Sequence, residues 1–261
     1  MIRVDGTNYL WMGAPANGPA AATQTAFQYT STKSTFTFSV GGKVEMNVTF
    51  LSPLTPADQK RQSLVFSYLD VVVQSTDGAS HDVQLYTDIS AGMSTHVTLE
   101  SQLTHATEWV AGDHSSVAQW DYGTTSDHIA YHKVYRQTQL LFSETNQQAD
   151  WGYWYWSTKN VPNLSYQSGQ DVVVRGAFMS NGTLPNTQDT NYRPIDDAWP
   201  VFGYSVNLSS VVGPVSTLYT LGLTQEEAIQ FDGETGIVPV TSLWTSYFAS
   251  ELDAVGKLPS H

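Results

Sequence analysis

Two histidines stand four residues apart in the segment DHIAYH, residues 127–132. On a β-strand this spacing places His128 and His132 on one face, and two imidazoles on one face can supply two ligands to a metal ion. Asp127 adds a neighbouring carboxylate, but the sequence identifies no third ligand. The plainer hypothesis, that both histidines lie on the solvent side of a half-exposed strand, is favoured, and no metal ion or cofactor is expected.

A run of aromatic side chains occurs in DWGYWYWS, residues 150–157, with five aromatic residues around one glycine. An exposed platform of Trp151, Trp154 and Trp156 would stack the rings of sugars, which indicates a carbohydrate-binding module. Such a run more often fills a sandwich edge or a domain interface, because each ring can bury roughly 150 Å² or more. Packing is the favoured interpretation, and sugar binding is retained as the alternative.

A pair of adjacent carboxylates occurs in RPIDDAW, residues 193–199. Asp196 and Asp197 could act as general acid and general base, or they could cap a turn before Trp199. Adjacent residues on a strand point to opposite faces, so a catalytic pair made of these two alone is disfavoured.

The short motifs of several large enzyme classes do not occur in the sequence. It contains no G-x-S-x-G, H-E-x-x-H or G-x-G-x-x-G string and no phosphate-binding P-loop. It also contains no cysteine, which excludes disulfides, thiolate nucleophiles and cysteine-ligated metals. Hydrolysis by the chain itself, through Asp121 or Asp127 with His128, remains a third possibility without a supporting motif.

Alternating hydrophobicity indicates the elements that would position these groups. Residues 33–51 alternate apolar and polar side chains on both sides of Gly41-Gly42, which predicts a β-hairpin. Strands at this spacing, with few helical periods between them, predict an all-β fold, a large antiparallel β-sandwich over residues 1–241. Further strands are expected at residues 64–73, 81–86, 116–122, 128–137, 171–178 and 201–212.

Helical patterns appear only near the C-terminus. The string TQEE at residues 224–227 is a capping-box pattern and predicts a short helix toward Phe231. Residues 242–261 are expected to form a separate segment, an amphipathic helix followed by a tail. Its apolar face would carry Leu243, Trp244, Tyr247, Phe248 and Leu252.

Composition and charge narrow the class of protein. The 261 residues carry a formal net charge of −13, only 13% of them are charged, and 41% are hydrophobic. An acidic, weakly charged chain excludes a basic nucleic-acid-binding face and a polybasic membrane patch, so neither nucleic acid nor a membrane is expected as a partner. The apolar content suffices for a packed globular core.

Four N-x-S/T sequons, at Asn47, Asn163, Asn181 and Asn207, indicate an N-glycosylated, secreted protein. The first 15 residues contain no basic segment followed by an apolar run, so they form neither a signal peptide nor a membrane anchor. We therefore expect an extracellular protein whose signal peptide is missing from this chain.

Long strings of the sequence resemble the fungal secreted glutaminase A family. They include VDGTNYLWMGAP, TQTAFQYTSTKSTFTFSVGGKVEMNVTFLSP, KRQSLVFSYLDVVVQSTDGASHDVQLYTDISA and SLWTSYFASELDA. The resemblance implies the N-terminal all-β domain of an enzyme that hydrolyses L-glutamine to L-glutamate and ammonia. It also implies an intramolecular partner, a helical catalytic domain missing from this chain, toward which Trp244, Tyr247 and Phe248 would face. No catalytic residue is carried over by the resemblance.

Two segments depart from the family pattern. Residues 92–107 are inserted relative to it, and their codons are compatible with a short intron read through in frame. An ordinary polar surface loop is the alternative, and sequencing the spliced transcript separates the two. Read-through is favoured, so His96 and His105 are not expected to be ligands. The last residues, 256–261, are compatible with a second read-through.

These observations favour a supporting domain of an enzyme over a carbohydrate-binding module. The favoured function is that of the N-terminal β-sandwich domain of a glutaminase A-like enzyme, supporting the cleft and inactive alone. The alternative is a secreted carbohydrate-binding module that uses the three tryptophans of residues 150–157.

Overall fold

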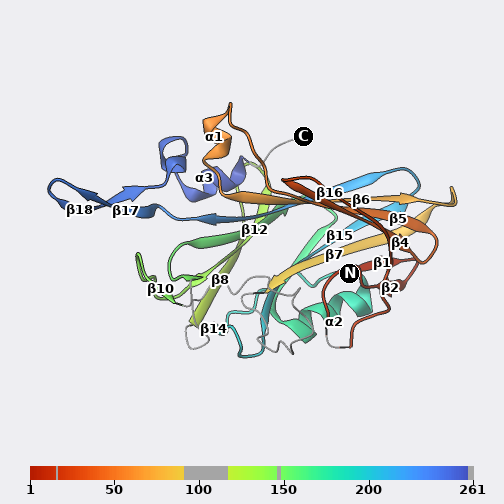
Figure 1. Cartoon of the computed structure of the whole chain (residues 1–261). Helices are drawn as coiled ribbons and strands as arrows, with labels where there is room; N and C mark the ends of the chain where they lie inside the picture. The colour runs from red at the N-terminus through yellow and green to blue at the C-terminus, as the bar shows by residue number, and fades with distance from the viewer. Residues whose placement is uncertain (16, 91–116, 146–147, 258–261) are drawn as a thin grey trace, which may run out of the picture.

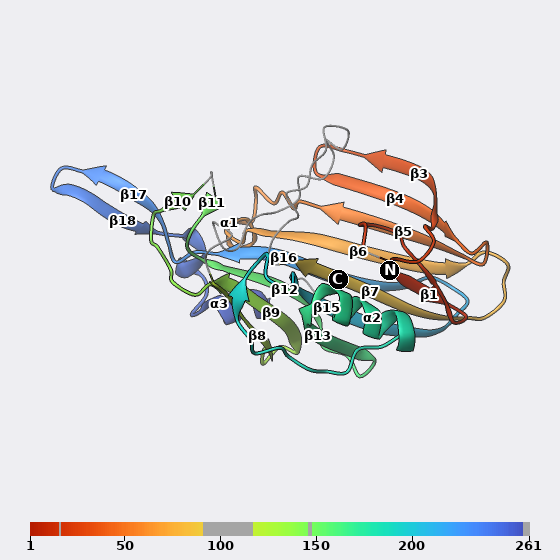
Figure 2. The same ribbon diagram turned by 90° about the horizontal axis from the view of Figure 1, so that it is seen from below.

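The computed structural model describes residues 1–15, 17–90, 117–145 and 148–257. The predicted insertion at 92–107 and the end of the C-terminal tail lie outside the described residues. Two antiparallel sheets face each other and form a sandwich, which confirms the predicted fold class (Figures 1 and 2). A short C-terminal helix, α3 (Glu251–Gly256), is also present, within the longer segment where the sequence predicts a helix.

The larger sheet contains nine strands. Their spatial order is β14 (Arg193–Pro194), β8 (Val117–Thr124), β9 (Ile129–Arg136), β12 (Tyr153–Lys159), β16 (Val215–Thr224), β6 (Phe66–Ser75), β5 (Val44–Leu51), β4 (Lys33–Val40) and β3 (Thr23–Tyr29). The smaller sheet contains five strands, in the order β13 (Leu164–Gln170), β15 (Pro200–Val211), β7 (His81–Ser90), β1 (Ile2–Val4) and β2 (Thr7–Tyr9).

Two small hairpins and four short helical segments complete the described chain. The hairpins pair β10 (Glu144–Thr145) with β11 (Gln148–Ala149) and β17 (Glu227–Gly233) with β18 (Gly236–Thr241). The helical segments are α1 (Gln59–Gln62), α2 (Asp171–Asn181), the 3₁₀ segment η1 (Leu243–Ser246) and α3 (Glu251–Gly256).

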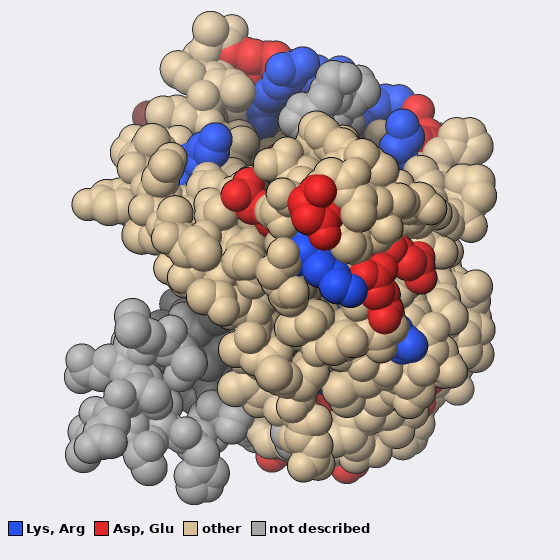
Figure 3. Space-filling view, turned by 90° about the vertical axis from the view of Figure 1, so that its right-hand side faces the viewer, with Lys and Arg blue, Asp and Glu red and all other residues tan. Residues whose placement is uncertain are grey.

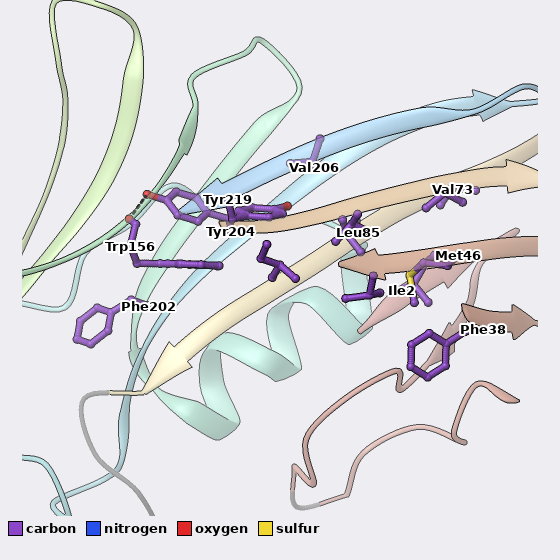
Figure 4. Close-up of a cluster of buried hydrophobic side chains, with 14 of the residues drawn as sticks. Ile2, Phe38, Met46, Val73, Leu85, Trp156, Phe202, Tyr204, Val206 and Tyr219 are labelled. Carbon is purple, nitrogen blue, oxygen red and sulfur yellow. Dashed lines mark hydrogen bonds between the residues drawn. The ribbon is translucent and has the colours of Figure 1, made fainter. Parts of the chain in front are cut away.

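The main core lies between the two sheets, where alternate residues of each strand point inward. The hairpin predicted at residues 33–51 is confirmed, since β4 and β5 pair directly and Phe38 stands opposite Met46. Both side chains are buried (Figure 4). On the opposite sheet, the Tyr204 hydroxyl donates a hydrogen bond to the backbone carbonyl of Trp156 (3.1 Å) and so joins β15 to β12.

The strand predicted at residues 171–178 is wrong, because this segment forms helix α2 on the outer face of the smaller sheet (Figure 1). Val174 and Phe178, one helical turn apart, are buried there, and the Phe178 ring packs 5.0 Å from that of Tyr86. Gly182 ends the helix in the left-handed conformation (φ 71°), as a C-terminal cap requires. Tertiary burial at helical spacing therefore outweighs the β-propensity of three consecutive valines.

Both helix predictions near the C-terminus need correction. The capping-box pattern at residues 224–227 leads into strand β17, not a helix. Residues 242–255 do not form one helix either, because the chain breaks between η1 and α3. Ser250 caps the second piece, its side chain accepting a hydrogen bond from the Asp253 backbone amide (3.1 Å).

Helix α3 covers the outer face of the larger sheet. Val255 packs there with Phe66 and Tyr155, and all three side chains are buried. Glu251 adds an ion pair to Lys133 on β9, with both side chains largely buried. The described part of the C-terminal segment is thus packed on the sandwich itself.

This outer layer makes one glycine sensitive to substitution. A Cβ atom at Gly222 would lie 2.0 Å from Cδ1 of Phe66, whose ring is only 4% exposed. We expect Gly222→Ala to lower the free energy of unfolding by about 1–3 kcal/mol, because the crowded ring has little room to move. Urea unfolding midpoints measure this change.

Gly176, in the middle of α2, is the matched control. A Cβ atom there meets nothing within 4 Å. Gly176→Ala should therefore raise the stability by about 0.5–1 kcal/mol, since alanine is the better helix former. Equal midpoints for the two variants would contradict this account of Phe66.

Candidate functional site

A polar hollow of about 430 Å³ opens between the end of β13, the first turn of α2 and residues 187–198. Strand β13 delivers Gln167 and Gln170 to it, and α2 contributes the apolar Val173. The segment that was singled out in the sequence for its two aspartates, RPIDDAW, supplies another part of the wall. The remaining polar side chains that line the hollow are Ser168, Thr187, Gln188, Asp189, Asn191, Arg193 and Asp197.

Arg193 holds the wall of this hollow together. Its guanidinium donates to the Asp189 carboxylate (2.7 Å) and to the backbone carbonyls of Asn191 (2.6 Å) and Asp197 (2.8 Å). The guanidinium carbon also lies 5.4 Å from the centre of the Trp120 ring. Arg193 is 6% exposed, so its charge serves these internal partners. The arginine therefore shapes the wall of the hollow, and its positive charge is not available to bind an anion there.

The two adjacent aspartates lie in a turn, where the Asp197 backbone amide donates to the Pro194 carbonyl (3.1 Å). Asp197 lines the hollow, and both aspartates are exposed. The next two residues, Ala198 and Trp199, have φ values of 54° and 35°, a conformation that costs free energy in residues other than glycine. The carbonyl of Trp199 accepts a hydrogen bond from the first amide of α2, at Asp171 (3.1 Å), which helps to hold this turn.

Gln167, which lines the hollow, carries a buried hydrogen-bond acceptor without a partner among the described residues. The residue is 8% exposed, and its Oε1 atom has no hydrogen-bond partner among the described residues. A buried amide oxygen without a donor costs about 1–3 kcal/mol. The amides, hydroxyls and carboxylates that line the hollow suit a neutral polar ligand that carries hydroxyl or amide donors.

The lining residues do not form a nucleophile and base pair. Ser168 is the one serine among the lining residues and thus the candidate nucleophile, but its Oγ accepts a hydrogen bond from the Asp189 backbone amide (3.3 Å). The lining contains no histidine or lysine that could act as its base. Acyl transfer by a serine needs a base within hydrogen-bond distance of the nucleophile. The hollow can therefore bind a ligand, but its own groups do not assemble this chemistry.

The two histidines do not share a face. Strand β9 begins at Ile129, so the strand alternation does not reach His128, which is exposed in a turn with φ 60°. His132 is buried between the sheets, with its ring 4.8 Å from that of Tyr204 and its Nε2 3.3 Å from the Gly203 carbonyl. Burial lowers the pKa of His132 to about 3. The expectation of two solvent-side histidines is thus wrong for His132.

The carboxylates near the histidines have other partners. Asp127 forms an ion pair with Lys257 (2.8 Å) next to α3. Asp121, on β8, accepts a hydrogen bond from the Tyr135 hydroxyl (3.3 Å), and burial together with this carboxylate raises the pKa of Tyr135 to about 12. Neither arrangement gives His128 the carboxylate partner that a hydrolytic site would need.

A third histidine, His81, belongs to a charged cluster at one end of the sandwich. Its Nδ1 lies 2.9 Å from Asp5 and its Nε2 lies 3.0 Å from Asp77. The two carboxylates raise the pKa of His81, while hydrogen bonds to backbone and side chains lower the pKa of Asp77 to about 2. Asp5 also pairs with Lys43 (2.7 Å), so the cluster joins the start of β7 to the connections that contain Asp5, Lys43 and Asp77.

The three tryptophans of the aromatic run do not form one platform. Trp156 is buried against Tyr219, with ring centroids 5.2 Å apart, and Trp154 packs partly buried on the same core. Trp151 lies apart from them, and its indole nitrogen donates to the Glu227 carbonyl (2.9 Å). Strand alternation in β12 explains the inward direction of the first two. Sugar binding by these residues stays a prediction without support from this arrangement.

The four sequons differ in exposure. Asn163, Asn181 and Asn207 are exposed. Asn47 is half-buried on β5, where its side chain accepts from the Thr37 hydroxyl (2.7 Å). Three of the four acceptors are therefore open to modification as they stand, and glycosylation stays a prediction for all four.

The three residues predicted to face another domain are already packed in part. Trp244 and Phe248 are 7% and 6% exposed and form a small cluster with Ala254 and Leu64. Tyr247 is half-exposed. The structure therefore leaves no exposed patch made of all three, and a contact of these residues with another domain stays a prediction.

Charges on the surface are sparse and mixed. On the face shown in Figure 3, basic and acidic side chains stand beside one another in small groups, and most of the surface is neither. No helix among the residues that the structure describes is long and apolar enough to cross a membrane.

Sequence reasoning missed Gln167 and Asp189. Gln167 carries no motif, and its burial depends on α2, which was expected to be a strand. The spacing of Asp189 and Arg193, opposite charges four residues apart, was the one available signal, and it is weak outside a helix.

The fold and the hollow define an antiparallel β-sandwich domain with a polar, ligand-sized depression on its smaller sheet. The chain belongs to the family described as "Domain of unknown function (DUF5127)", whose model matches residues 32–259.

Two curated relatives carry glutaminase names. The chain is 54% identical to Glutaminase A of Aspergillus oryzae over 255 residues, which are 97% of this chain and 34% of that protein. It is 28% identical to a probable glutaminase of Arthroderma benhamiae over 224 residues, 80% of this chain and 23% of that protein. The resemblance to the glutaminase A family is thus confirmed, and the chain spans about a third or less of the length of these relatives.

Solved structures show only a distant likeness. A heparan sulfate lyase HepC mutant from Pedobacter heparinus aligns with a TM-score of 0.36 and 8% identity, over 85% of this chain and 28% of that chain. A likeness at this level carries no argument about the function of the chain.

Proposed function

We propose that this chain is the β-sandwich domain of a glutaminase A-like amidohydrolase and that it supports the substrate cleft without being active alone. The observation that carries the proposal is the 54% identity to Glutaminase A over 97% of the chain, in a relative about three times as long. The parent reaction would be hydrolysis of L-glutamine to L-glutamate and ammonia.

The chemistry of amide hydrolysis supports a catalytic centre outside the described residues. The reaction needs an activated water or nucleophile, a base to take its proton and donors for the developing oxyanion. In the described part of the chain, His132 is enclosed in the core, His128 stands in an exposed turn and Asp127 is paired with Lys257. We infer that these groups are supplied by the helical catalytic domain of the longer polypeptide.

An extracellular location fits this proposal, since three of the four sequon asparagines are exposed. The enzyme would then meet glutamine as a free small molecule outside the cell.

Ammonia release from glutamine tests the proposal directly. We expect the full-length protein, collected from the culture medium of a secreting host, to release ammonia, and the 261-residue chain at equal concentration to give no more than the buffer blank. Circular dichroism of the isolated chain, showing β-structure and cooperative unfolding, is the control for folding. Turnover by the folded isolated chain would overturn the claim that catalysis lies elsewhere, and absence of full-length protein from the medium would overturn the location.

A further inference from the structure

The hairpin formed by β17 and β18 projects from the sandwich and pairs with no other strand of the described chain (Figures 1 and 2). Every residue of β18 is exposed, as are most residues of β17. An isolated two-stranded hairpin is at best marginally stable in water, because nothing covers either face. The sandwich therefore does not supply the packing that would stabilise this hairpin.

One face of the hairpin is apolar. Ile229 stands opposite Val240, and Phe231 stands opposite Val238, so these four side chains point to the same side. Their exposed fractions are 60%, 40%, 58% and 41%. The other face mixes the polar Gln230 and Asp232 with their partners Pro239 and Ile237.

The base of the hairpin is fixed to the sandwich. The carbonyl of Gln225 accepts hydrogen bonds from the Ser242 hydroxyl (2.5 Å) and from the Trp244 indole nitrogen (3.1 Å). The Trp151 indole nitrogen donates to the Glu227 carbonyl (2.9 Å). Three side chains thus fix the base of the hairpin, while its apolar face stays exposed to solvent. Such an open face with free strand edges favours association with another surface.

We propose that this apolar hairpin face is the surface on which the rest of the longer polypeptide packs. The inference rests on the proposed function, since it names the part of this domain that meets its partner. The match covers only 34% of the length of Glutaminase A, so a large part of such a protein is available to cover the face. The hairpin also leads into η1 and α3, and Leu243, the first residue of η1, is exposed.

The absence of charge on this face decides the chemistry of the partner. None of the four side chains can form an ion pair, so the covering surface must itself be apolar and must exclude water over the hairpin. A second copy of the same hairpin is the competing occupant, and it would make protection depend on protein concentration.

Hydrogen exchange compares the full-length protein with the isolated chain. We expect amides of residues 229–240 to exchange at least about tenfold more slowly in the full-length protein, because opening the hairpin then requires undocking. Phe231→Ser should remove this protection in the full-length protein while leaving the melting temperature of the isolated chain unchanged. Gln230→Ser, on the opposite face, is the matched control and should keep the protection.

Two results would overturn the inference. One is equal exchange of these amides in the full-length protein and the isolated chain. The other is protection of the isolated chain that rises with its concentration, which would assign the face to a second copy. The exchange result is independent of ammonia release, so a failure of the proposed function and a failure of this docking surface can be told apart.

Discussion

Arg193→Ala is expected to lower the free energy of unfolding by about 2–4 kcal/mol. The guanidinium is 6% exposed and satisfies the Asp189 carboxylate together with two backbone carbonyls. Alanine would leave all three acceptors without their donor inside the loop. The range is set below that of a fully enclosed pair because Asp189 is 27% exposed. Urea unfolding, with an unchanged m-value, measures the loss.

Arg61 offers a matched control in the same chain. It pairs with Asp58 at 3.3 Å, but the two side chains are 72% and 45% exposed, so Arg61→Ala should change stability by no more than about 1 kcal/mol. Arg193→Lys should fall between the two, since a lysine keeps the charge but cannot reach three acceptors in a fixed plane. An Arg193→Ala variant as stable as Arg61→Ala would show that Arg193 does not hold the wall of the hollow.

The sandwich could be predicted from the sequence because its signal is local. Between the paired sheets, one face of each strand is buried, so residues 33–51 show the alternation that a hairpin demands. The failures arise where burial depends on a distant element. Three consecutive valines in α2 favour a strand by propensity. The segment forms a helix because Val174 and Phe178, at helical spacing, are buried against Tyr86 of the smaller sheet.

The candidate site could be predicted only in part. The segment RPIDDAW was singled out for Asp196 and Asp197, and it does line the hollow, but Arg193 is the residue that organises it. The role of an arginine depends on which carbonyls surround it, and those come from a loop whose path no periodicity describes. The same reason hid Gln167, whose unpaired oxygen exists only once α2 and the loop close over β13.

Acid should destabilise the protein through His132. Burial lowers its pKa in the folded protein to about 3, whereas an unfolded histidine titrates near pH 6.5. Between these values the unfolded state binds the proton and the folded state does not, so stability falls as the pH falls. The slope is about 1.4 kcal/mol per pH unit, or about 2–3 kcal/mol between pH 6.5 and 4.5.

The variant His132→Phe isolates this contribution, because every other titrating group is common to both proteins. We expect the difference in unfolding free energy between wild type and variant to stay constant above pH 7. Below about pH 6 it should move in favour of the variant with the slope given above. A difference that stays constant down to pH 4.5 would show that His132 is not held neutral in the core.

His81 supplies the comparison of opposite sign. Asp5 and Asp77 raise its pKa in the folded protein, so its contribution is complete below the unfolded pKa of about 6.5 and is lost as the pH rises through the folded value. Replacing His81 by Asn should therefore cost less stability as the pH is raised above 7, a range in which the effect of His132→Phe stays constant. Two histidines of one chain would then report opposite pH dependences because one is enclosed by aromatic rings and the other stands between two carboxylates.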